Sequence, residues 1–484
     1  MRGVWTTDRV KVAEERLMAR TPVGALMRIA AFGVATHAAR LLAERTGGVA
    51  GRRVTLLVGG GNNGGDALWA GAFLRRRSVG VTAVLLSPER AHTEGLAALR
   101  RAGGRIVSTK DAPASAHLVI DGIVGLSARG PLRPAAAELM DRITAPVLAV
   151  DLPSGVDPDT GAVDGPAVGA DVTVTFGCLK PVHVLGAGIV RSGTVHLVDI
   201  GLGPELGEPD LIVLDPADVG RAWPVPGPRD DKYTQGVTGV AAGSATYPGA
   251  AVLTAGAAVL ATSGMVRYAG SAADEVRARW PEVVATGSVA DAGRVQAWVA
   301  GPGLGTGSAG REVLAGVLRD GVPVCVDADG ITLLATNPEL WDARDPDAAV
   351  VLTPHDREFA RIAEPLGISL GADRVAAAGE LAKRTGSVVL LKGHSTIVAD
   401  PTGRVLVNPA RSAWLATAGS GDVLSGLLGA LLAAGLDPWL AAGCAAWVHE
   451  RAGSLAASGV PTSASRILEA IPGAVRAARA AVTA

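Results

Sequence analysis

Residues 50–200 consist of short apolar, β-branched runs that alternate with longer Ala- and Leu-rich stretches. Apolar runs without polar interruptions are typical of strands buried on both faces, and strands that alternate with helices are typical of a parallel sheet covered by helices. The predicted strands are Arg53–Val58, Val81–Leu86, Leu118–Asp121, Val147–Asp151, Val172–Phe176 and Val195–Asp199. The predicted helices are Asp66–Arg77 and Pro134–Ile143.

A second α/β pattern follows a proline-rich stretch. Its strand-bearing segments are Gly236–Ser244, Ala297–Gly305, Val322–Gly330, Ala349–Phe359 and Ser387–Val398, and its helices are Gly249–Thr262 and one that begins beside Asp422. Six prolines between Gly201 and Arg229 indicate a stiff connector, although Leu211–Leu214 would suit a final strand. We therefore expect two α/β domains, 1–224 and 225–484.

Three loops rich in glycine and polar residues follow predicted strands in the first half. They read GGGNNGGD from Gly59, DGIVGLSARG from Asp121 and DLPSGVD from Asp151. Ligands of open α/β sheets bind beyond the carboxyl ends of the strands, where glycine allows close backbone approach. The first loop fits the spacing G-x-G-x-x-G, but a bound dinucleotide also needs an acidic residue after the second strand. Ser87 and Pro88 stand there instead, so a redox cofactor is disfavoured.

Side chains in and beside these loops suggest a chemistry. Asn63, Asp121 and Ser154 offer oxygen atoms, the ligands that hard cations prefer. Asp151 ends a strand inside the expected crevice, where burial would raise its pKa enough for acid–base work. Lys180 follows another strand and is one of only six lysines among 45 basic residues, which suggests that its compact charge is needed.

The second half carries its clearest signal where a Gly/Ser turn opens into a long helix. The amides of Gly419, Ser420 and Gly421 would form a nest for an anion at the helix N-terminus. Asp422, in the first turn, would either serve as an ordinary helix cap or act as the base for a hydroxyl that attacks a phosphoryl group. The Walker A sequence is absent, so a P-loop enzyme is excluded.

Composition narrows the setting. The chain of 484 residues is 48% hydrophobic, and its net charge of −1 arises from mixed signs, which argues against a nucleic-acid partner. Three widely spaced cysteines form neither a disulfide framework nor a zinc motif. The N-terminus lacks the apolar core of a signal peptide, and the longest apolar run, Val423–Leu436, is too short and too rich in glycine to cross a bilayer. We expect a cytoplasmic protein with no membrane partner.

The three loops of the first half, in this order, resemble the NAD(P)H-hydrate epimerase family over roughly Arg9–Leu211. The resemblance implies a Rossmann-like three-layer sandwich, with K⁺ bound by Asn63, Asp121 and Ser154. It also implies that Asp151 contacts the substrate as the leading acid–base candidate, with Lys180 as its candidate partner. The residues implied to line the hydrate site are Asn62, Asn63, Gly64, Gly65, Asp66, Gly125, Leu126, Ser127, Ala128, Arg129, Gly130 and Pro131. The second loop departs from the family's commoner D-A-(L/I)-F-G-T-G-L pattern but keeps Asp121 and Gly125.

Motifs of the second half resemble the ribokinase-like superfamily and, within it, the ADP/ATP-dependent NAD(P)H-hydrate dehydratases, over about Arg229–Leu468. They read YPGAA, GPGLG, DADG, TPHDRE, LKGHST and GSGDVLSG. The residues implied to contact the hydrate are Ala250, Gly303, His355 and Asp422. Those implied to hold the adenine nucleotide are Lys392, Gly393, His394, Ser395, Thr396 and Gly421. One departure is Arg357, which stands where the family usually has glycine.

Together the two resemblances imply repair of hydrated NAD(P)H. The first domain would interconvert the R and S epimers. The second would dehydrate the S epimer at the expense of ADP, giving AMP and phosphate, with Asp422 activating the hydroxyl and Mg²⁺ offsetting phosphate charge. Two alternatives stay open from the sequence: a ribokinase-like kinase of a small alcohol with a nucleotide-sensing first domain, and a binding module without activity. We also expect a homo-oligomer.

Overall fold

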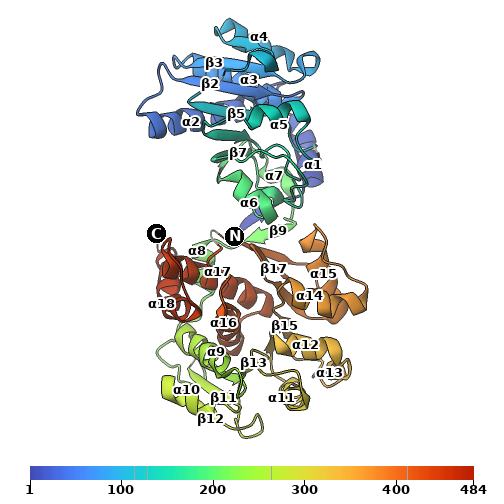
Figure 1. Cartoon of the computed structure of the whole chain (residues 1–484), viewed down its shortest axis with the longest axis vertical. Coiled ribbons are helices and arrows are strands. Elements are labelled where there is room, and N and C mark those ends of the chain that lie inside the picture. Colours follow the sequence, from blue (N-terminus) through green and yellow to red (C-terminus); the bar gives the residue numbers. More distant parts are fainter. Residues whose placement is uncertain (114, 128, 263, 411–412, 484) are drawn as a thin grey trace. The chain divides into compact units, whose positions relative to one another are not determined.

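The computed structural model describes residues 1–113, 115–127, 129–262, 264–410 and 413–483. These residues form two compact units, an N-terminal unit of Gly3–Leu211 and a C-terminal unit that starts at Ile212 and also includes Met1–Arg2. Both units are mixed α/β structures, as the hydrophobic pattern predicts (Figure 1). The compact units divide at Leu211, while the assignment of functional domains to 1–224 and 225–484 stays a prediction.

A parallel sheet forms the centre of the N-terminal unit. Its strand order, among the described residues, is β4-β3-β2-β5-β6-β7-β8. The strands are β2 (Arg53–Val58), β3 (Gly80–Leu85), β4 (Arg105–Val107), β5 (Leu118–Gly122), β6 (Val147–Val150), β7 (Val172–Phe176) and β8 (Thr194–Val198). The order reverses between β2 and β5, so the loops that leave these two strands diverge and create a ligand crevice.

Helices cover both faces of this sheet. They are α1 (Thr7–Met18), α2 (Ala25–Thr46), α3 (Asn62–Arg75), α4 (Thr93–Arg101), α5 (Pro134–Met140), α6 (Gly186–Ser192) and α7 (Gly203–Leu206). Along β2, Leu56 packs into a core shared with α1, α2 and α3, whereas Leu57 packs into a core shared with α5. Successive strand residues point to opposite faces, so two cores on one strand mean a three-layer structure.

Helix α2 was not predicted from the sequence. By length and composition alone it is long and apolar enough to cross a membrane, and 44% of its most apolar 18-residue stretch is buried in the structure. Ala31, Val34 and Ala38 of this helix belong to the core that covers the sheet. Core helices of globular proteins pass the same length and composition test.

The C-terminal unit is built on a second sheet, in which most strands are parallel. Its order is β1-β9-β18-β17-β16-β15-β14-β13-β10-β11-β12, and β17 runs antiparallel to both of its neighbours. The strands are β1 (Arg2–Val4), β9 (Leu211–Val213), β10 (Val237–Ala241), β11 (Met265–Ala269), β12 (Val284–Thr286), β13 (Ala297–Ala300), β14 (Val324–Val326), β15 (Val350–Leu352), β16 (Val388–Leu391), β17 (Ser395–Ala399) and β18 (Val405–Pro409). The strand predicted at Leu211 is present as β9, which pairs with β18 through Ile212 and Leu406.

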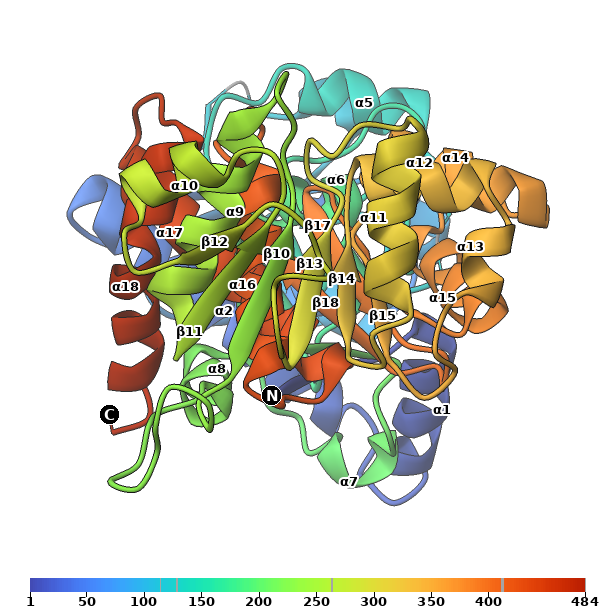
Figure 2. The ribbon, with the colours of Figure 1, turned by 90° about the horizontal axis from the view of Figure 1, so that it is seen from below.

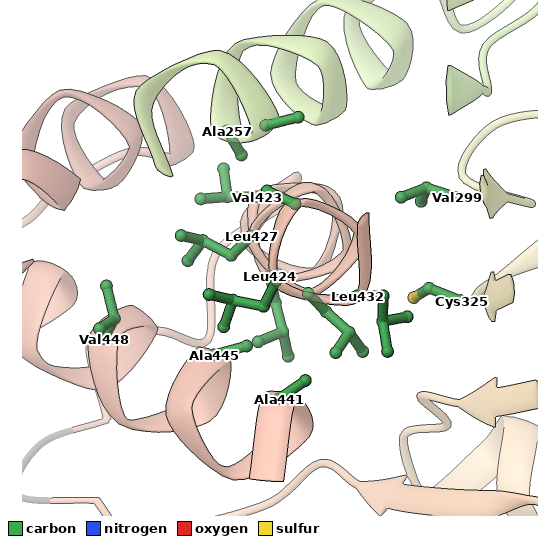
Figure 3. Close-up of a cluster of buried hydrophobic side chains, with 14 of the residues drawn as sticks. Ala257, Val299, Cys325, Val423, Leu424, Leu427, Leu432, Ala441, Ala445 and Val448 are labelled. Atoms are coloured by element: carbon green, nitrogen blue, oxygen red, sulfur yellow. The ribbon is translucent and has the colours of Figure 1, made fainter. Parts of the chain in front are cut away.

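The helices of this unit also lie on both sides of their sheet, with α11 and α12 in front and α16 behind in Figure 2. They are α8 (Pro216–Ala222), α9 (Pro248–Ala261), α10 (Ala273–Arg279), α11 (Ser308–Leu318), α12 (Asp329–Thr336), α13 (Glu339–Asp342), α14 (Asp356–Ala363), α15 (Arg374–Thr385), α16 (Ser420–Ala433), α17 (Pro438–Ala457) and α18 (Ala464–Ala480). Helix α16 is surrounded by apolar groups: Ala257 of α9, Ala445 of α17 and Cys325 of β14 all face it (Figure 3). Its buried position fixes where its N-terminus, and thus Asp422, lies.

Candidate active sites

The first two glycine-rich loops of the N-terminal unit meet at the reversal point between β2 and β5. Helix α3 begins at Asn62, directly after the first loop. A Cβ placed on Gly59 would lie 1.8 Å from the backbone oxygen of Ile123, and one on Gly125 would lie 3.4 Å from Asn63 Cβ. The two loops therefore touch along their backbones, and only glycine permits the contact at position 59.

The two adjacent asparagines of the first loop have different environments. Asn62 is exposed, whereas Asn63 is buried and donates from its amide nitrogen to the Val124 carbonyl over 2.6 Å. That bond turns the side-chain carbonyl oxygen of Asn63 away from Val124. The rest of the motif, Gly64–Asp66, is buried in the first turns of α3. The buried asparagine therefore holds the second loop, while the role of the exposed one as a ligand contact stays a prediction.

Asp121 and Ser154 form a buried hydrogen-bonded pair next to Asn63. Asp121 accepts from the Ser154 hydroxyl (2.7 Å), the Ser154 amide (2.9 Å) and the Ile123 amide (3.1 Å). Burial raises the pKa of Asp121 to about 6, although these bonds oppose the rise. Because the Ser154 hydroxyl also accepts from the Val124 amide over 3.2 Å, the three predicted cation ligands converge on the start of the second loop.

Asp151 and Lys180 form a buried ion pair. Lys180 Nζ donates to Asp151 Oδ1 (2.7 Å), Thr175 Oγ1 (2.9 Å) and the Phe176 carbonyl (2.9 Å), so each of its protons has an acceptor. Burial disfavours both charges, but their mutual attraction outweighs it, which lowers the pKa of Asp151 and raises the pKa of Lys180. The expectation that burial raises the pKa of Asp151 is therefore wrong, and neither group changes its charge near neutral pH.

The backbone around Asp151 is strained and tightly held. Its φ of 65° lies in the left-handed region, which costs a residue other than glycine about 1–3 kcal/mol. Its carbonyl is 2.9 Å from His183 Nε2, and His183 Nδ1 accepts from the Lys180 amide over 3.0 Å. Burial lowers the pKa of His183 to about 4, so the ring is neutral and its Nε2 proton donates to Asp151. His183, which the sequence did not point to, thus holds the backbone of Asp151, while Lys180 and Thr175 hold its carboxylate.

The second loop is tied to the N-terminal helix by Arg129. Its guanidinium donates to Asp159 Oδ2 (2.7 Å), to the Thr7 hydroxyl (3.1 Å) and to the Leu126 carbonyl (3.0 Å). Arg129 therefore holds the loop in this structure. Ala128, also predicted to line the site, lies outside the described residues. Besides Arg129, the exposed residues of the second loop are Ser127, Gly130 and Pro131.

Two further carboxyls lie near the Asp151–Lys180 pair. Asp66, a predicted substrate contact, is 7% exposed. Glu14 on α1 is partly buried and was not predicted. Burial raises the pKa of Glu14 to about 7, with Lys180 opposing the rise and Asp151 adding to it. The local sequence does hold a signal for Glu14, because this acidic residue stands among the core-facing positions of its helix.

In the C-terminal unit, the glycine-rich turn stands at the start of α16 as predicted, but the Ser420 amide donates to the Thr417 carbonyl over 3.2 Å, so the predicted anion nest is reduced to the amides of Gly419 and Gly421. Gly419, with a φ of 82°, precedes the helix, and Ser420 and Gly421 form its first turn. A Cβ placed on Gly421 would lie 3.4 Å from Lys392 Nζ, so the nest faces the lysine that follows β16. Burial raises the pKa of Asp422 to about 7, with Asp327 adding to the rise and Lys392 opposing it. A carboxyl with that pKa is suited to accept a proton near neutral pH.

Asp327, at the end of β14, joins Lys392 to α16. Its Oδ1 accepts from Lys392 Nζ over 2.8 Å, and its Oδ2 accepts from the Ser425 hydroxyl over 2.7 Å. Burial opposes both charges, but the attraction to Lys392 prevails and lowers the pKa of Asp327. The DADG motif drew attention to this strand end, but Asp327 itself was not predicted as a site residue.

The predicted hydrate contacts of this unit fall into two groups. Ala250 and Gly303 lie together, since a Cβ on Gly303 would be 2.9 Å from the Ala250 methyl and 2.9 Å from Tyr247 Cβ. His355 caps α14 and donates its backbone amide to Glu358 Oε2 over 2.9 Å. Glu358 Oε2 is 3.7 Å from Lys392 Nζ and so connects His355 to the lysine.

The predicted nucleotide-binding segment is the turn between β16 and β17. Lys392 directly follows β16, as predicted, and Gly393 and His394 make the turn into β17. Ser395 and Thr396 are the first two residues of β17. The backbone of this turn thus lies beside Lys392, at the same sheet edge as the nest.

A buried histidine is hydrogen-bonded to Ser420, the first residue of α16. Ser420 Oγ is 2.9 Å from His449 Nε2 on α17. Burial lowers the pKa of His449 to about 4, so the ring is neutral. No motif pointed to His449, because the two residues meet only through the packing of α16 on α17.

Two family models match the chain. Residues 23–182 match the model of the YjeF-related protein N-terminus, and residues 238–472 match the NAD(P)H-hydrate dehydratase model. The chain is 58% identical over 439 residues to the bifunctional NAD(P)H-hydrate repair enzyme Nnr of Mycobacterium tuberculosis (strain ATCC 25618 / H37Rv), and the match covers 90% of each chain. The chain belongs to the family of bifunctional NAD(P)H-hydrate repair enzymes. This membership confirms both resemblances drawn from the motifs.

Other repair enzymes and one solved structure are also similar. The repair enzyme Nnr of Mycobacterium leprae (strain TN) is 56% identical over 479 residues, which cover 97% of this chain and 98% of the relative. A crystal structure of the ADP/ATP-dependent NAD(P)H-hydrate dehydratase from Bacillus subtilis, co-crystallized with ATP/Mg²⁺, is 25% identical with a TM-score of 0.49 and covers 54% of this chain and 96% of that chain.

Proposed function

We propose that this chain repairs hydrated NAD(P)H in two steps, one in each unit. The N-terminal unit interconverts the R and S epimers of the hydrate, and the C-terminal unit dehydrates the S epimer at the expense of ADP, yielding AMP and phosphate. The observation that carries the proposal is the position of Asp422, with a pKa near neutral, beside the anion nest of α16. A base next to a phosphate-binding nest is what phosphorylation of a substrate hydroxyl requires.

In the C-terminal unit, Asp422 takes the proton of the C6 hydroxyl as its oxygen attacks the terminal phosphoryl group of ADP. A new P–O bond forms and AMP leaves. The C6–O bond then breaks, phosphate departs with the bonding electrons, and loss of the C5 proton restores the ring double bond. Lys392 Nζ and the amide of Gly421 stabilise the phosphoryl charge. Ala250, Gly303 and His355 contact the hydrate.

The nucleotide occupies the turn Gly393–Thr396 together with Lys392 and Gly421. In the part of the chain that the structure describes, no group of three His, Cys, Asp or Glu residues is placed to hold a metal ion. The phosphates of ADP would carry the Mg²⁺, which suits an ion that keeps most of its water ligands. When bound, it offsets phosphate charge.

In the N-terminal unit, the first turns of α3, Asn62–Asp66, and the loop Gly125–Pro131 hold the hydrate. The environment of Asp121 supports a K⁺ site, because the hydrogen bonds described for this buried carboxyl all come from neutral donors. A monovalent cation would compensate its charge, and Asn63 and Ser154 supply neutral oxygen ligands. When bound, the ion neutralises Asp121 and ties the two loops together.

A single assay tests both steps. Purified full chain is incubated with a racemic mixture of hydrated NADPH and excess ADP, and the absorbance of regenerated NADPH is followed. Complete recovery is expected. A stop near half recovery, apart from the slow spontaneous epimerisation, would contradict the epimerase step, and no recovery would contradict the dehydratase step. Replacement of ADP by ATP measures the nucleotide preference.

We also propose where the protein acts, how it assembles and which partners it lacks. The protein acts in the cytoplasm on free nucleotides, as a homo-oligomer, with neither a nucleic-acid nor a membrane partner. Size-exclusion chromatography with light scattering tests the oligomeric state, and a monomer would contradict it.

A further inference from the structure

Glu14 occupies an unusual place on helix α1. Val10, Ala13 and Leu17 of this helix are buried in the core of the N-terminal unit. Glu14 completes their i, i+3, i+4, i+7 pattern, which is the stripe of a helix that faces the core. Its neighbour Glu15 lies on the exposed side. A carboxyl on the core-facing side of a helix destabilises the fold. Its presence there indicates a role other than stability.

Backbone contacts hold the start of α1 beside the segment that carries Lys180. The Trp5 amide donates to the Leu179 carbonyl over 3.1 Å, and Val4 forms a parallel bridge with Leu179. This attachment places the start of α1 next to Leu179, the residue that precedes Lys180. Glu14 interacts electrostatically with both members of that pair.

Asp66 brings a second carboxyl to the same place from α3. It is 7% exposed, and its Oδ1 is buried without a hydrogen-bond partner among the described residues. An ionised carboxylate in that position would lack compensation, so the group is either protonated or completed by a ligand. Burial raises the pKa of Asp66 well above its usual value, with the charges of Asp151 and Glu14 adding to the rise.

The other titratable groups near Glu14 and Asp66 have settled charges. Lys180 and Asp151 are held as an ion pair. Burial raises the pKa of the Cys178 thiol to about 11, so this group stays protonated. Lys11, on the same helix as Glu14, lowers the pKa of Glu14 slightly through its positive charge.

We propose that Glu14 and Asp66 are the proton-transferring catalytic residues of the epimerase reaction, and that Asp151 and Lys180 orient the substrate as a fixed ion pair. The inference rests on the proposed function. It is carried by the unpartnered, buried carboxyl of Asp66 and by the core-facing position of Glu14 next to Lys180. It moves the acid–base role away from Asp151, to which the family resemblance assigned it.

The chemistry needs one acid and one base. The C6 hydroxyl of the hydrate sits on the carbon next to the ring nitrogen, so the nitrogen lone pair can displace it. The protonated carboxyl gives its proton to the hydroxyl, the C6–O bond breaks with its electrons leaving on water, and a C6=N1 double bond forms. Water then adds to the opposite face and gives a proton to the ionised carboxyl, while the C6=N1 electrons return to nitrogen. The two carboxyls exchange roles in the reverse direction.

The test uses the full chain and the purified R epimer with excess ADP. Since only the S epimer is dehydrated, NADPH formation then reports epimerisation above the spontaneous rate. Glu14→Gln and Asp66→Asn are each expected to lower this rate at least about a hundredfold, while Glu15→Gln leaves it unchanged. The dehydratase rate on the S epimer, measured on the same samples, is expected to stay at the wild-type value and verifies folding.

The pH dependence distinguishes proton transfer from a structural role. Because one carboxyl must be protonated and the other ionised, the epimerase rate of the wild type is expected to fall on both sides of an optimum, and Glu14→Asp is expected to keep part of the rate with a shifted limb. Wild-type rates in Glu14→Gln and Asp66→Asn, or an unshifted profile in Glu14→Asp, would overturn the inference. A wild-type chain that does not accelerate epimerisation would instead overturn the proposed function.

Discussion

Each unit places an aspartate–lysine ion pair at the carboxyl ends of its parallel strands. The two lysines differ in exposure and in how many of their ammonium protons are bound by protein acceptors. Lys180 is 0% exposed and its three protons all have protein acceptors. Lys392 is 21% exposed; among the described residues its Nζ donates to Asp327 Oδ1 over 2.8 Å and lies 3.7 Å from Glu358 Oε2. The first lysine can therefore only hold its surroundings in place, whereas the second can also reach a phosphate.

Both pairs are accompanied by a carboxyl whose pKa is about 7, Glu14 in the N-terminal unit and Asp422 in the C-terminal unit. In the proposed mechanism, an ion pair whose charges are fixed orients the site, and a separate carboxyl that titrates near neutral pH moves the proton. The comparison teaches that the conspicuous buried charge pair and the acid–base group of a site need not be the same residues.

The largest expected effect comes from Asp422. Asp422→Asn removes the base but keeps the size of the side chain, so the dehydratase rate is expected to fall about 10²–10⁴-fold. Epimer exchange of the hydrate, followed by chromatography without ADP, is expected to persist at the wild-type rate. Asp342→Asn, at an exposed position on α13, is the matched control. A dehydratase rate within a few fold of the wild type would show that the two units do not share this arrangement.

Breaking the buried pair of the N-terminal unit is the next largest effect. Lys180→Met leaves the Asp151 carboxylate uncompensated, which is expected to lower the free energy of unfolding by about 3–5 kcal/mol in urea denaturation. The pKa of Asp151 is lowered and that of Lys180 is raised, so the pair's stabilisation is lost only as pH falls through the acidic value or rises through the basic one. The loss in Lys180→Met should thus be similar from about pH 5 to 9. Exposed Lys110→Met is the control, and an equally small change in both would contradict the comparison.

The corresponding change in the C-terminal unit should act on binding rather than on folding. Lys392→Met is expected to raise the KM for ADP about tenfold, which corresponds to about 1.4 kcal/mol, with a smaller loss of unfolding free energy than Lys180→Met. Steady-state kinetics of dehydration with varied ADP measure it, with Lys383→Met on the exposed side of α15 as the control. An unchanged KM for ADP would mean that the side chain of Lys392, like that of Lys180, interacts only with protein groups and does not bind the nucleotide.

The smallest expected effect is the pH dependence of dehydration. A base must be ionised to work, and the pKa of Asp422 is about 7. The dehydratase rate should therefore rise with pH, reach half its plateau near pH 7, and gain only about twofold beyond that. A decline between pH 7 and 8 would be the wrong sign for a base. The epimerase rate, which needs both an acid and a base, should instead pass through an optimum.

Much of the fold was predictable because it depends on local patterns. The apolar runs of Arg53–Val58 and Val172–Phe176 form β2 and β7 with those same bounds, since a strand buried on both faces leaves no ambiguity about its core positions. Strand β4 at the sheet edge was missed, because only three residues, Arg105–Val107, take part. Helix α2 was missed because its long apolar sequence shows no clear period of polar residues.

The site residues can be divided in the same way, into those that the local sequence reveals and those that it does not. Asn63 and Asp422 lie at the start of a helix and Asp121 lies near the end of β5, where neighbouring residues already reveal their placement. The pairing of Asp327 with Lys392 joins residues 65 positions apart, and nothing local indicates it. Glu14 becomes part of the site only through the packing of α1 beside Leu179. Side chains that enter a site through long-range packing are those that the sequence alone does not reveal.

The scarcity of lysine makes the difference between the two pairs visible to reagents. An amine-directed label needs an accessible nitrogen, and Lys180 is fully buried, whereas Lys392 is 21% exposed at the proposed nucleotide site. The attraction to Asp327 raises the pKa of Lys392, so the labelling is done at alkaline pH. With six lysines in the chain, each labelled site can be separated by mass spectrometry. Lys180 should stay unlabelled while the N-terminal unit is folded, and Lys392 should lose its label when ADP is present. One protein thus carries its own reporters of folding and of nucleotide occupancy.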